Sequence, residues 1–553
     1  MNSTTTRTAI QAALAAAAMA FSAPGAAPPP GVAPPPDELD AIAGATAPVP
    51  IELGELSWTY PTPGVTRNGD ILVAEVPPSE PPGTAWAQAN LDLAPYAGRS
   101  IRLTIHVRGT GVGKPRMFYL GLKFMVKLEA EDGTLTWPDA DRKRTGDWEE
   151  DLTCCCDLSA GVKSAVLVLG LQAASGRVEF DLSTLRAEDV GVIVPRVNQS
   201  YRVSYPDAVR DRGLMRGVML PIDLEKIRED DFATLEQWGA TLVRYQMAKH
   251  WADRWAWERN EDFDKYMDFA LGILATNILP WAEKHGQKVV VDMHATPGAR
   301  NDRNENRMFY EDRYANHFVE VWRRIAERFK GDRRIYGYDL VNEPLQSWPA
   351  PYSYLHVQLA AARAIREADP DATIIVAANG CGDPAGFATL SPLAMDNVIY
   401  QPHFYSPHEY THQGVFDRRD AGTRRYPNPE MGWNKEYIRR QLAPVRDFQL
   451  RHGAKIYVGE FSAAVWAPGA GDYLRDCIEI FEEYGWDWTY HAFREWDGWS
   501  VEREWKGIEN GCDAFVPSAD NPRKHALLDG FARGRAAETP ARPQMKDKRD
   551  WKD

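Results

Sequence analysis

Two glutamates that lie far apart in the sequence are the side chains best suited to chemistry. Glu343 closes the run I-Y-G-Y-D-L-V-N-E-P at 335–344, where an apolar strand pattern stops and Pro344 removes a backbone donor. Glu460 stands in G-E-F at 459–461, after a second short apolar run. A carboxylate at the tip of a buried strand costs free energy unless it has partners or a function. Taken alone, Glu343 could equally be a capping or salt-bridged residue.

A pair of carboxylates is what the splitting of a glycosidic bond needs. One carboxyl must be protonated to give its proton to the leaving oxygen, and the other must be ionised to attack the anomeric carbon. Their surroundings must therefore hold their pKa values apart. Arg244 beside Glu460 would keep that group ionised, and the Tyr405 hydroxyl could hydrogen-bond to it. A charged Glu460 would in turn raise the proton affinity of Glu343.

The elements that must position these residues follow a regular alternation of strand and helix. Strands are predicted at 215–220, 241–245, 288–292, 335–341, 373–377, 398–401, 455–458 and 486–492, and helices include 262–285, 311–329, 354–368 and 472–484. Eight strands alternating with helices over 201–535 predict an α/β fold, the (β/α)8 TIM barrel, whose chemistry sits at the carboxyl ends of the strands.

Six of the predicted strand ends carry polar or aromatic groups that would face one opening. These groups are Arg244, His294, Asn342, Glu343, His403, Tyr405, Glu460 and Trp496. Each alone has a structural explanation as a salt bridge, a core histidine or a packing tryptophan, but the set together indicates an active site. Asn342 has the reach to donate to a sugar 2-hydroxyl, and Trp496 offers a flat face for a sugar ring.

This set resembles glycoside hydrolase family 5, the cellulase-like clan of retaining β-glycosidases, over about residues 205–530. The N-E-P at 342–344 and the G-E-F at 459–461 carry the resemblance, and Arg244, His294, His403, Tyr405 and Trp496 match its other positions. The resemblance implies that Glu343 is the acid/base, that Glu460 is the nucleophile, and that no cofactor or metal is needed. The strand-three segment departs from the pattern by continuing as Ala-Thr-Pro-Gly.

The rest of the chain is read as four further regions. Residues 1–23 hold Arg7 and an Ala-rich run ending in Ala-Met-Ala, which predicts a signal peptide and secretion to the extracellular space or periplasm. Residues 24–44 are rich in Pro and Ala and predict a disordered tether, and 536–553 a charged disordered tail. Residues 45–200 alternate in short runs, which predicts an all-β jelly-roll sandwich preceding the barrel.

The sandwich weakly resembles the jelly-roll carbohydrate-binding modules, so it either binds sugar or only supports the barrel. Its candidate platform residues are Trp58, Tyr60, Trp86, Trp137 and Trp148. The whole chain of 553 residues has a net charge of −14, which argues against nucleic acid or an anionic membrane as partner. We expect a monomer that acts on a β-linked polysaccharide or oligosaccharide.

One competing motif is the run from His408 to His412, H-E-Y-T-H, which formally matches a zinc peptidase signature. Pro407 and Gly414 flank it closely and no long amphipathic helix surrounds it, so a zinc site is disfavoured. The favoured activity is therefore an endo-β-1,4-glucanase. The alternatives are a β-mannanase, a xyloglucanase or an exo-acting β-glucosidase of the same family and, in a different class, a carbohydrate-binding protein without catalysis.

Overall fold

The computed structural model describes residues 45–536, apart from 80, 116–118, 132, 134, 141–143, 159–160, 194–195, 249–258, 302 and 510–511. The predicted signal peptide and tether, and nearly all of the predicted tail, lie outside the described residues. All described residues belong to one compact unit, Ile42–Asp553. In the part of the chain that the structure describes, no helix has both the length and the apolar character needed to cross a membrane.

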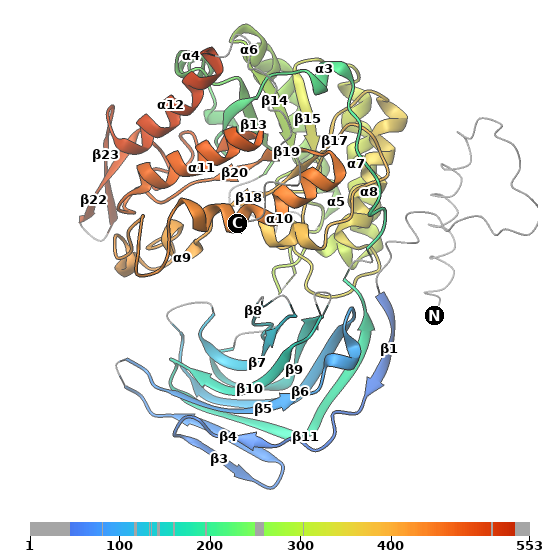
Figure 1. Ribbon diagram of the computed structural model, residues 1–553, viewed down its shortest axis with the longest axis vertical. Coiled ribbons are helices and arrows are strands. Elements are labelled where there is room, and N and C mark those ends of the chain that lie inside the picture. Colours follow the sequence, from blue (N-terminus) through green and yellow to red (C-terminus); the bar gives the residue numbers. More distant parts are fainter. Residues whose placement is uncertain are drawn as a thin grey trace, which may run out of the picture. The chain divides into compact units, whose positions relative to one another are not determined.

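The first part of the chain is a two-sheet antiparallel sandwich (Figure 1). One sheet has the order β3-β4-β11-β6-β9 with β1 beside β11, and the other has the order β2-β5-β10-β7-β8. The strands are β1 (Ala45–Ile51), β2 (Trp58–Thr59), β3 (Val65–Asn68), β4 (Ile71–Val76), β5 (Thr84–Leu91), β6 (Ser100–Val112), β7 (Gly121–Glu129), β8 (Leu135–Thr136), β9 (Gly146–Asp157), β10 (Ser164–Gln172) and β11 (Gly176–Gly191). Apolar side chains from both sheets form one core, so the predicted all-β sandwich is confirmed.

The sandwich leaves some of its aromatic candidates accessible. Trp137 is 53% exposed and Tyr60 is 46% exposed. Trp148 instead packs against the core and covers Gly109, where an added Cβ would come within 2.4 Å of the indole. The sugar-binding role of this region stays a prediction.

The second part is a closed parallel barrel, as predicted. Its strands, in barrel order, are β12 (Arg216–Met219), β13 (Leu242–Gln246), β14 (Lys288–Asp292), β15 (Ile335–Asp339), β16 (Ile374–Ala377), β17 (Val398–Gln401), β19 (Lys455–Val458) and β21 (Asp487–Tyr490). Short strands β18 (His403–Phe404) and β20 (Glu460–Phe461) continue two of them, and β22 (Arg503–Glu509) pairs with β23 (Cys512–Pro517).

Helices surround the barrel strands (Figure 1). They are α3 (Asp207–Arg210), α4 (Glu229–Trp238), α5 (Asn260–Ile273), α6 (Leu279–Lys284), α7 (Asp312–Arg328), α8 (Tyr354–Ala368), α9 (His408–Thr411), α10 (Lys435–His452), α11 (Ala470–Tyr484) and α12 (Pro522–Ala536). The predicted helix at 262–285 is interrupted by a π-helical turn, Leu274–Ile278, between α5 and α6.

Amphipathic sequence explains how these helices cover the strands. In α7 the buried side chains Phe318, Trp322 and Ile325 recur at helical spacing on one face. Trp322 also donates its indole N–H to Leu340 O at 3.2 Å, just beyond β15. This contact ties the helix to the strand end that leads into Glu343.

Strand register brings polar residues together at one end of the barrel. Gln246 pairs with Asp292 across β13 and β14, and Asp292 pairs with Asp339 across β14 and β15. His403 pairs with Glu460 across β18 and β20. Below this layer the barrel interior is filled by apolar and aromatic side chains, namely Leu242, Val290, Tyr336, Ile375, Ile399 and Tyr457. The apolar layer thus supports a polar layer at the carboxyl ends of the strands.

Candidate active site

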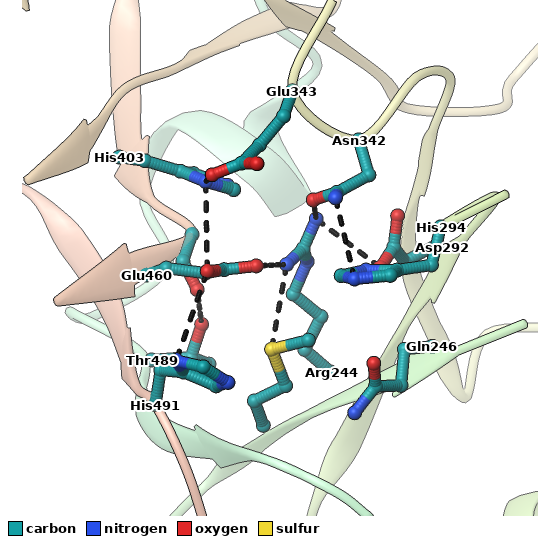
Figure 2. A network of polar contacts seen from close by, with 12 residues as sticks. Arg244, Gln246, Asp292, His294, Asn342, Glu343, His403, Glu460, Thr489 and His491 are labelled. Carbon is teal, nitrogen blue, oxygen red and sulfur yellow. Dashed lines mark hydrogen bonds and ion pairs between the residues drawn. The ribbon is translucent and has the colours of Figure 1, made fainter. Parts of the chain in front are cut away.

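Both predicted glutamates lie at the carboxyl end of the barrel and point toward the same space (Figure 2). His403 lies between them, with its Nδ1 at 3.1 Å from Glu343 Oε1 and 3.7 Å from Glu460 Oε2. One oxygen of each carboxyl and His403 Nδ1 all lie within 4.8 Å of one another. This closeness matches retaining glycosidases, whose carboxyls are about 5–5.5 Å apart, and not inverting ones at about 6.5–9.5 Å.

Arg244 binds the second glutamate, Glu460 (Figure 2). Its Nη1 donates to Glu460 Oε1 at 2.6 Å, and its Nη2 donates to Asn342 Oδ1 at 2.9 Å. The guanidinium also contacts Asp339 at 2.9 Å and Asp292 at 3.2 Å, and it is fully buried. One cation is therefore shared by several buried carboxylates and fixes their relative positions.

The charges around Glu460 keep it ionised. Burial alone would raise the pKa of Glu460, but His403, His491, Arg244 and His294 lower it by more, so this pKa lies well below its ordinary value. A carboxylate in this state is available as a nucleophile at mildly acidic pH.

Asp339 is the carboxyl with the opposite behaviour. Burial raises its pKa to about 7, with a further rise from Asp292, against the lowering effect of Arg244. Gln401 Nε2 donates to Asp339 Oδ2 at 2.5 Å, and Gly459 is required beside this amide, because an added Cβ there would lie 2.6 Å from Gln401 Nε2. The glycine of G-E-F therefore makes room for the support under the site.

The backbone at Glu343 adopts a conformation that is uncommon for this residue type. Its φ is +48°, in the left-handed region, which costs about 1–3 kcal/mol for a residue other than glycine. Arg300 Nη2 donates to Glu343 O at 2.7 Å and holds this turn. A strained, anchored carboxylate of this kind is typical of a functional site.

Two further predicted residues, Asn342 and His294, form a second cluster beside Arg244. His294 Nδ1 lies 2.8 Å from Asp292 Oδ2, and its Nε2 lies 3.3 Å from Asn342 Nδ2. Burial lowers the pKa of His294, but the neighbouring Asp292 raises it by more, so the net direction is upward. The structure thus joins both residues to the Arg244 network.

Tyr405 also reaches Glu460, and it leads to residues that the sequence analysis missed. The Tyr405 hydroxyl donates to Glu460 Oε2 at 2.8 Å and lies 2.8 Å from His491 Nδ1. Strand β21 ends at Tyr490 and not at 492 as predicted, so His491 stands at the strand tip. Because the predicted strand ended two residues too late, its candidate residues were Glu495-Trp496-Asp497. A strand end at Tyr490 would have placed His491 among the candidates.

Trp496 is placed in a tryptophan cluster beyond β21. Its ring lies 5.8 Å from that of Trp466 and 5.5 Å from that of Trp499, both in edge-to-face geometry. Arg418 lies over both the Trp466 and the Trp496 rings. The role of Trp496 as a stacking face for sugar stays a prediction.

The H-E-Y-T-H run forms only the four-residue helix α9, with His412 just past its end. The His408 and His412 rings stack with centroids 4.0 Å apart, and His412 Nδ1 lies 3.0 Å from the Thr411 hydroxyl. Desolvation lowers the pKa of both imidazoles. We therefore interpret this run as a short turn that packs beside the site through Tyr410 and Thr411, with His408 and Glu409 exposed.

Glu343, His403 and Glu460 have spacing that would suit a metal ion in another setting. Here the Arg244 guanidinium already neutralises Glu460. The guanidinium thus supplies the positive charge that a metal ion would otherwise bring to Glu460.

Comparison with known proteins finds a matching family model and similar chains. The family model described as cellulase, glycosyl hydrolase family 5, matches residues 215–497. Endoglucanase C of Acetivibrio thermocellus is 27% identical over 48% of this chain and 84% of its own length. Cellodextrinase A of Ruminococcus flavefaciens is 22% identical over 52% of this chain and 88% of its own length. The solved structure of endoglucanase Cel5A from Thermotoga maritima is 21% identical over 57% of this chain and 96% of its own, with a TM-score of 0.43.

Proposed function

Because the chain belongs to glycosyl hydrolase family 5, a family of retaining glycoside hydrolases, we propose that it cleaves β-linked glucans with Glu343 as the acid/base and Glu460 as the nucleophile. The family model spans just over half of the chain. The observation that supports the two roles best is the contrast between the two carboxyls. Glu460 forms an ion pair with the buried Arg244 cation. Glu343 instead contacts His403, which lies between the two carboxyls.

The reaction would run in two steps. Glu343 gives its proton to the glycosidic oxygen while a Glu460 oxygen attacks the anomeric carbon, which breaks the C–O bond and forms a glycosyl ester on Glu460. Glu343, now ionised, takes a proton from water, and the water oxygen displaces Glu460 from the anomeric carbon. Two inversions leave the product with the configuration of the substrate.

The favoured substrate is a β-1,4-glucan cut internally. The relatives named endoglucanase and cellodextrinase support a glucan over other β-linked chains. A β-mannanase, a xyloglucanase and an exo-acting β-glucosidase of the same family are the alternatives. Rates on soluble cellulose derivatives, mixed-linkage glucan, mannan, xyloglucan and aryl β-glucosides distinguish them, and a fast fall in viscosity relative to sugar release identifies internal cutting.

Secretion belongs to the proposal as well. Its support is the Ala-rich run within 1–23, which ends in Ala-Met-Ala. Expression of the full chain in a bacterium, followed by N-terminal sequencing of the exported protein, tests it. A mature protein that begins shortly after this run is expected, and retention of the uncleaved chain inside the cell contradicts it.

The roles of the two glutamates are tested by Glu343→Gln and Glu460→Gln on two kinds of substrate. On a polysaccharide, loss of acid catalysis in Glu343→Gln should lower kcat/KM by about 10²- to 10⁴-fold. On a dinitrophenyl β-cellobioside, whose leaving group needs no proton, the same variant should keep kcat/KM near the wild-type value. Glu460→Gln should lose activity on both.

Glu409→Gln serves as the matched control, because Glu409 is an exposed glutamate on α9 outside the network. It should behave as the wild type on both substrates. Unchanged hydrolysis in Glu343→Gln and Glu460→Gln would instead indicate a different active site, and a wild type that binds the glucan without hydrolysing it would support a binding protein.

A further inference from the structure

The Tyr405 hydroxyl has one proton and two neighbours within hydrogen-bond distance. Glu460 Oε2 and His491 Nδ1 each lie 2.8 Å from the hydroxyl oxygen. An ionised carboxylate can only accept, so the Tyr405 proton must point to Glu460. The hydroxyl oxygen then has to accept, and His491 Nδ1 must carry a proton. The hydrogen-bond network therefore fixes which nitrogen of His491 is the donor.

The other side of the His491 ring faces a second carboxyl. His491 Nε2 lies 3.7 Å from Glu495 Oε1, and the two side chains are only 14% and 12% exposed. Glu495 is anchored in turn, because Gln246 Nε2 donates to its Oε2 at 2.6 Å and to Leu220 O at 2.7 Å. A chain of contacts thus runs from β13 through Glu495 and His491 to Tyr405 and the nucleophile.

The groups that face His491 set its charge. Glu460 Oε2 is 3.9 Å away, and Arg244 and His412 are further positive or titratable neighbours. Burial lowers the pKa of His491, but Glu460 and Glu495 raise it by more, so the net direction is above the ordinary value. This direction favours the protonated imidazole beside the same Glu460 carboxylate that Arg244 binds.

We propose that His491 is a positioning residue which, oriented by Glu495, holds the Tyr405 hydroxyl with its proton on Glu460 and so fixes the nucleophile in its attacking position. This inference rests on the proposed role of Glu460. It adds to that role a support that acts through Tyr405 and needs no contact with the sugar. If His491 Nδ1 carried no proton, the Tyr405 proton could turn toward the imidazole. Glu460 would then lose one hydrogen-bond partner.

The test uses the full chain and a dinitrophenyl β-cellobioside, so that protonation by Glu343 does not limit kcat/KM. His491→Leu removes the donor, and His491→Asn keeps an N–H near the position of Nδ1 without a titrating group. His491→Leu loses the hydrogen bond to the Tyr405 hydroxyl, so kcat/KM should fall by roughly tenfold or more. His491→Asn should restore that hydrogen bond and recover most of the lost kcat/KM. Both variants must show wild-type unfolding curves, and His491→Met, which also has no N–H, replaces His491→Leu where that variant does not.

Two further readouts separate positioning from mere packing. In a Tyr405→Phe background, His491→Leu should add no further loss, because both changes act through the same hydroxyl. Glu495→Gln removes the carboxylate that orients the ring but leaves the His491 N–H in place, so it should lower kcat/KM less than His491→Leu does.

Additive losses in the double variant would overturn the proposal. So would equal impairment of His491→Leu and His491→Asn, or kcat/KM within twofold of the wild type in both. Each of these outcomes presupposes an active wild-type enzyme. A wild type without hydrolysis would instead count against the proposed function itself.

Discussion

Arg244 Nη1 lies 2.6 Å from Glu460 Oε1, and both side chains are buried. The same guanidinium contacts Asp339 and Asp292, so removal of its charge would leave three buried carboxyls without their shared cation. Arg244 therefore both positions Glu460 and stabilises the fold. The pair has a counterpart at the start of β12, where the buried Arg216 binds Glu482 at 2.6 Å, away from Glu343 and Glu460.

The first prediction concerns these two arginines. Arg244→Met should lower the free energy of unfolding by about 3–5 kcal/mol, because it strands buried charge, and should abolish hydrolysis. Arg216→Met should lower stability by a similar amount and leave kcat of the folded enzyme nearly unchanged. Urea unfolding followed by fluorescence, with kcat measured well below the unfolding midpoint, checks both. Full activity in Arg244→Met would contradict the role of Arg244 in holding Glu460.

A second prediction follows from the raised pKa of Asp339, about 7 in the folded protein. The unfolded value is about 3.9, so between pH 4 and 7 the native state holds a proton that the unfolded state lacks. Stability should therefore fall as pH rises through this window, by up to about 1.4 kcal/mol per unit from this group. Asp339→Asn should remove that part of the slope. Unfolding curves for both proteins between pH 4 and 8 provide the comparison, and identical slopes would contradict the assignment.

A third prediction addresses Asn342. Its Oδ1 is occupied by Arg244, which leaves the Nδ2 group as the donor for a sugar 2-hydroxyl. Asn342→Ala should lower kcat/KM by about 10- to 100-fold on an aryl β-glucoside. On the 2-deoxy analogue, the wild type and the variant should differ far less, since the contact is missing in both. An equal loss on the two substrates would assign Asn342 a purely structural role.

A fourth prediction is that chelation leaves hydrolysis intact. Arg244 supplies the charge that a metal would otherwise bring to Glu460, and the His408 and His412 rings are stacked on each other. Dialysis against EDTA should keep kcat/KM within about twofold of the untreated enzyme, since no step of acid–base and nucleophilic hydrolysis uses a metal. Activity that is lost to the chelator, restored by zinc and retained in Glu460→Ala would point to a zinc peptidase.

Sequence reasoning succeeded where the pattern is set by local rules. The eight strands follow from apolar runs that stop at polar residues, but Arg244 lies in the middle of β13 and not at its tip as predicted, and Glu343 lies beyond the end of β15. It did not extend to Asp339 or Gln401, because a polar side chain inside a buried strand has no visible partner until the register is known. His491 was missed for a different reason, since a strand boundary shifted by two residues changes which side chain reaches the site.

The most direct test of the central claim is to trap the glycosyl-enzyme. A dinitrophenyl 2-deoxy-2-fluoro-β-cellobioside slows both steps but retains a good leaving group, so the ester should accumulate. Mass spectrometry of the intact protein should show one added fluorocellobiosyl group, and peptide analysis should place it on Glu460. A label on Glu343 or elsewhere would contradict the account, as would an unlabelled but active enzyme whose first product has the inverted anomeric configuration.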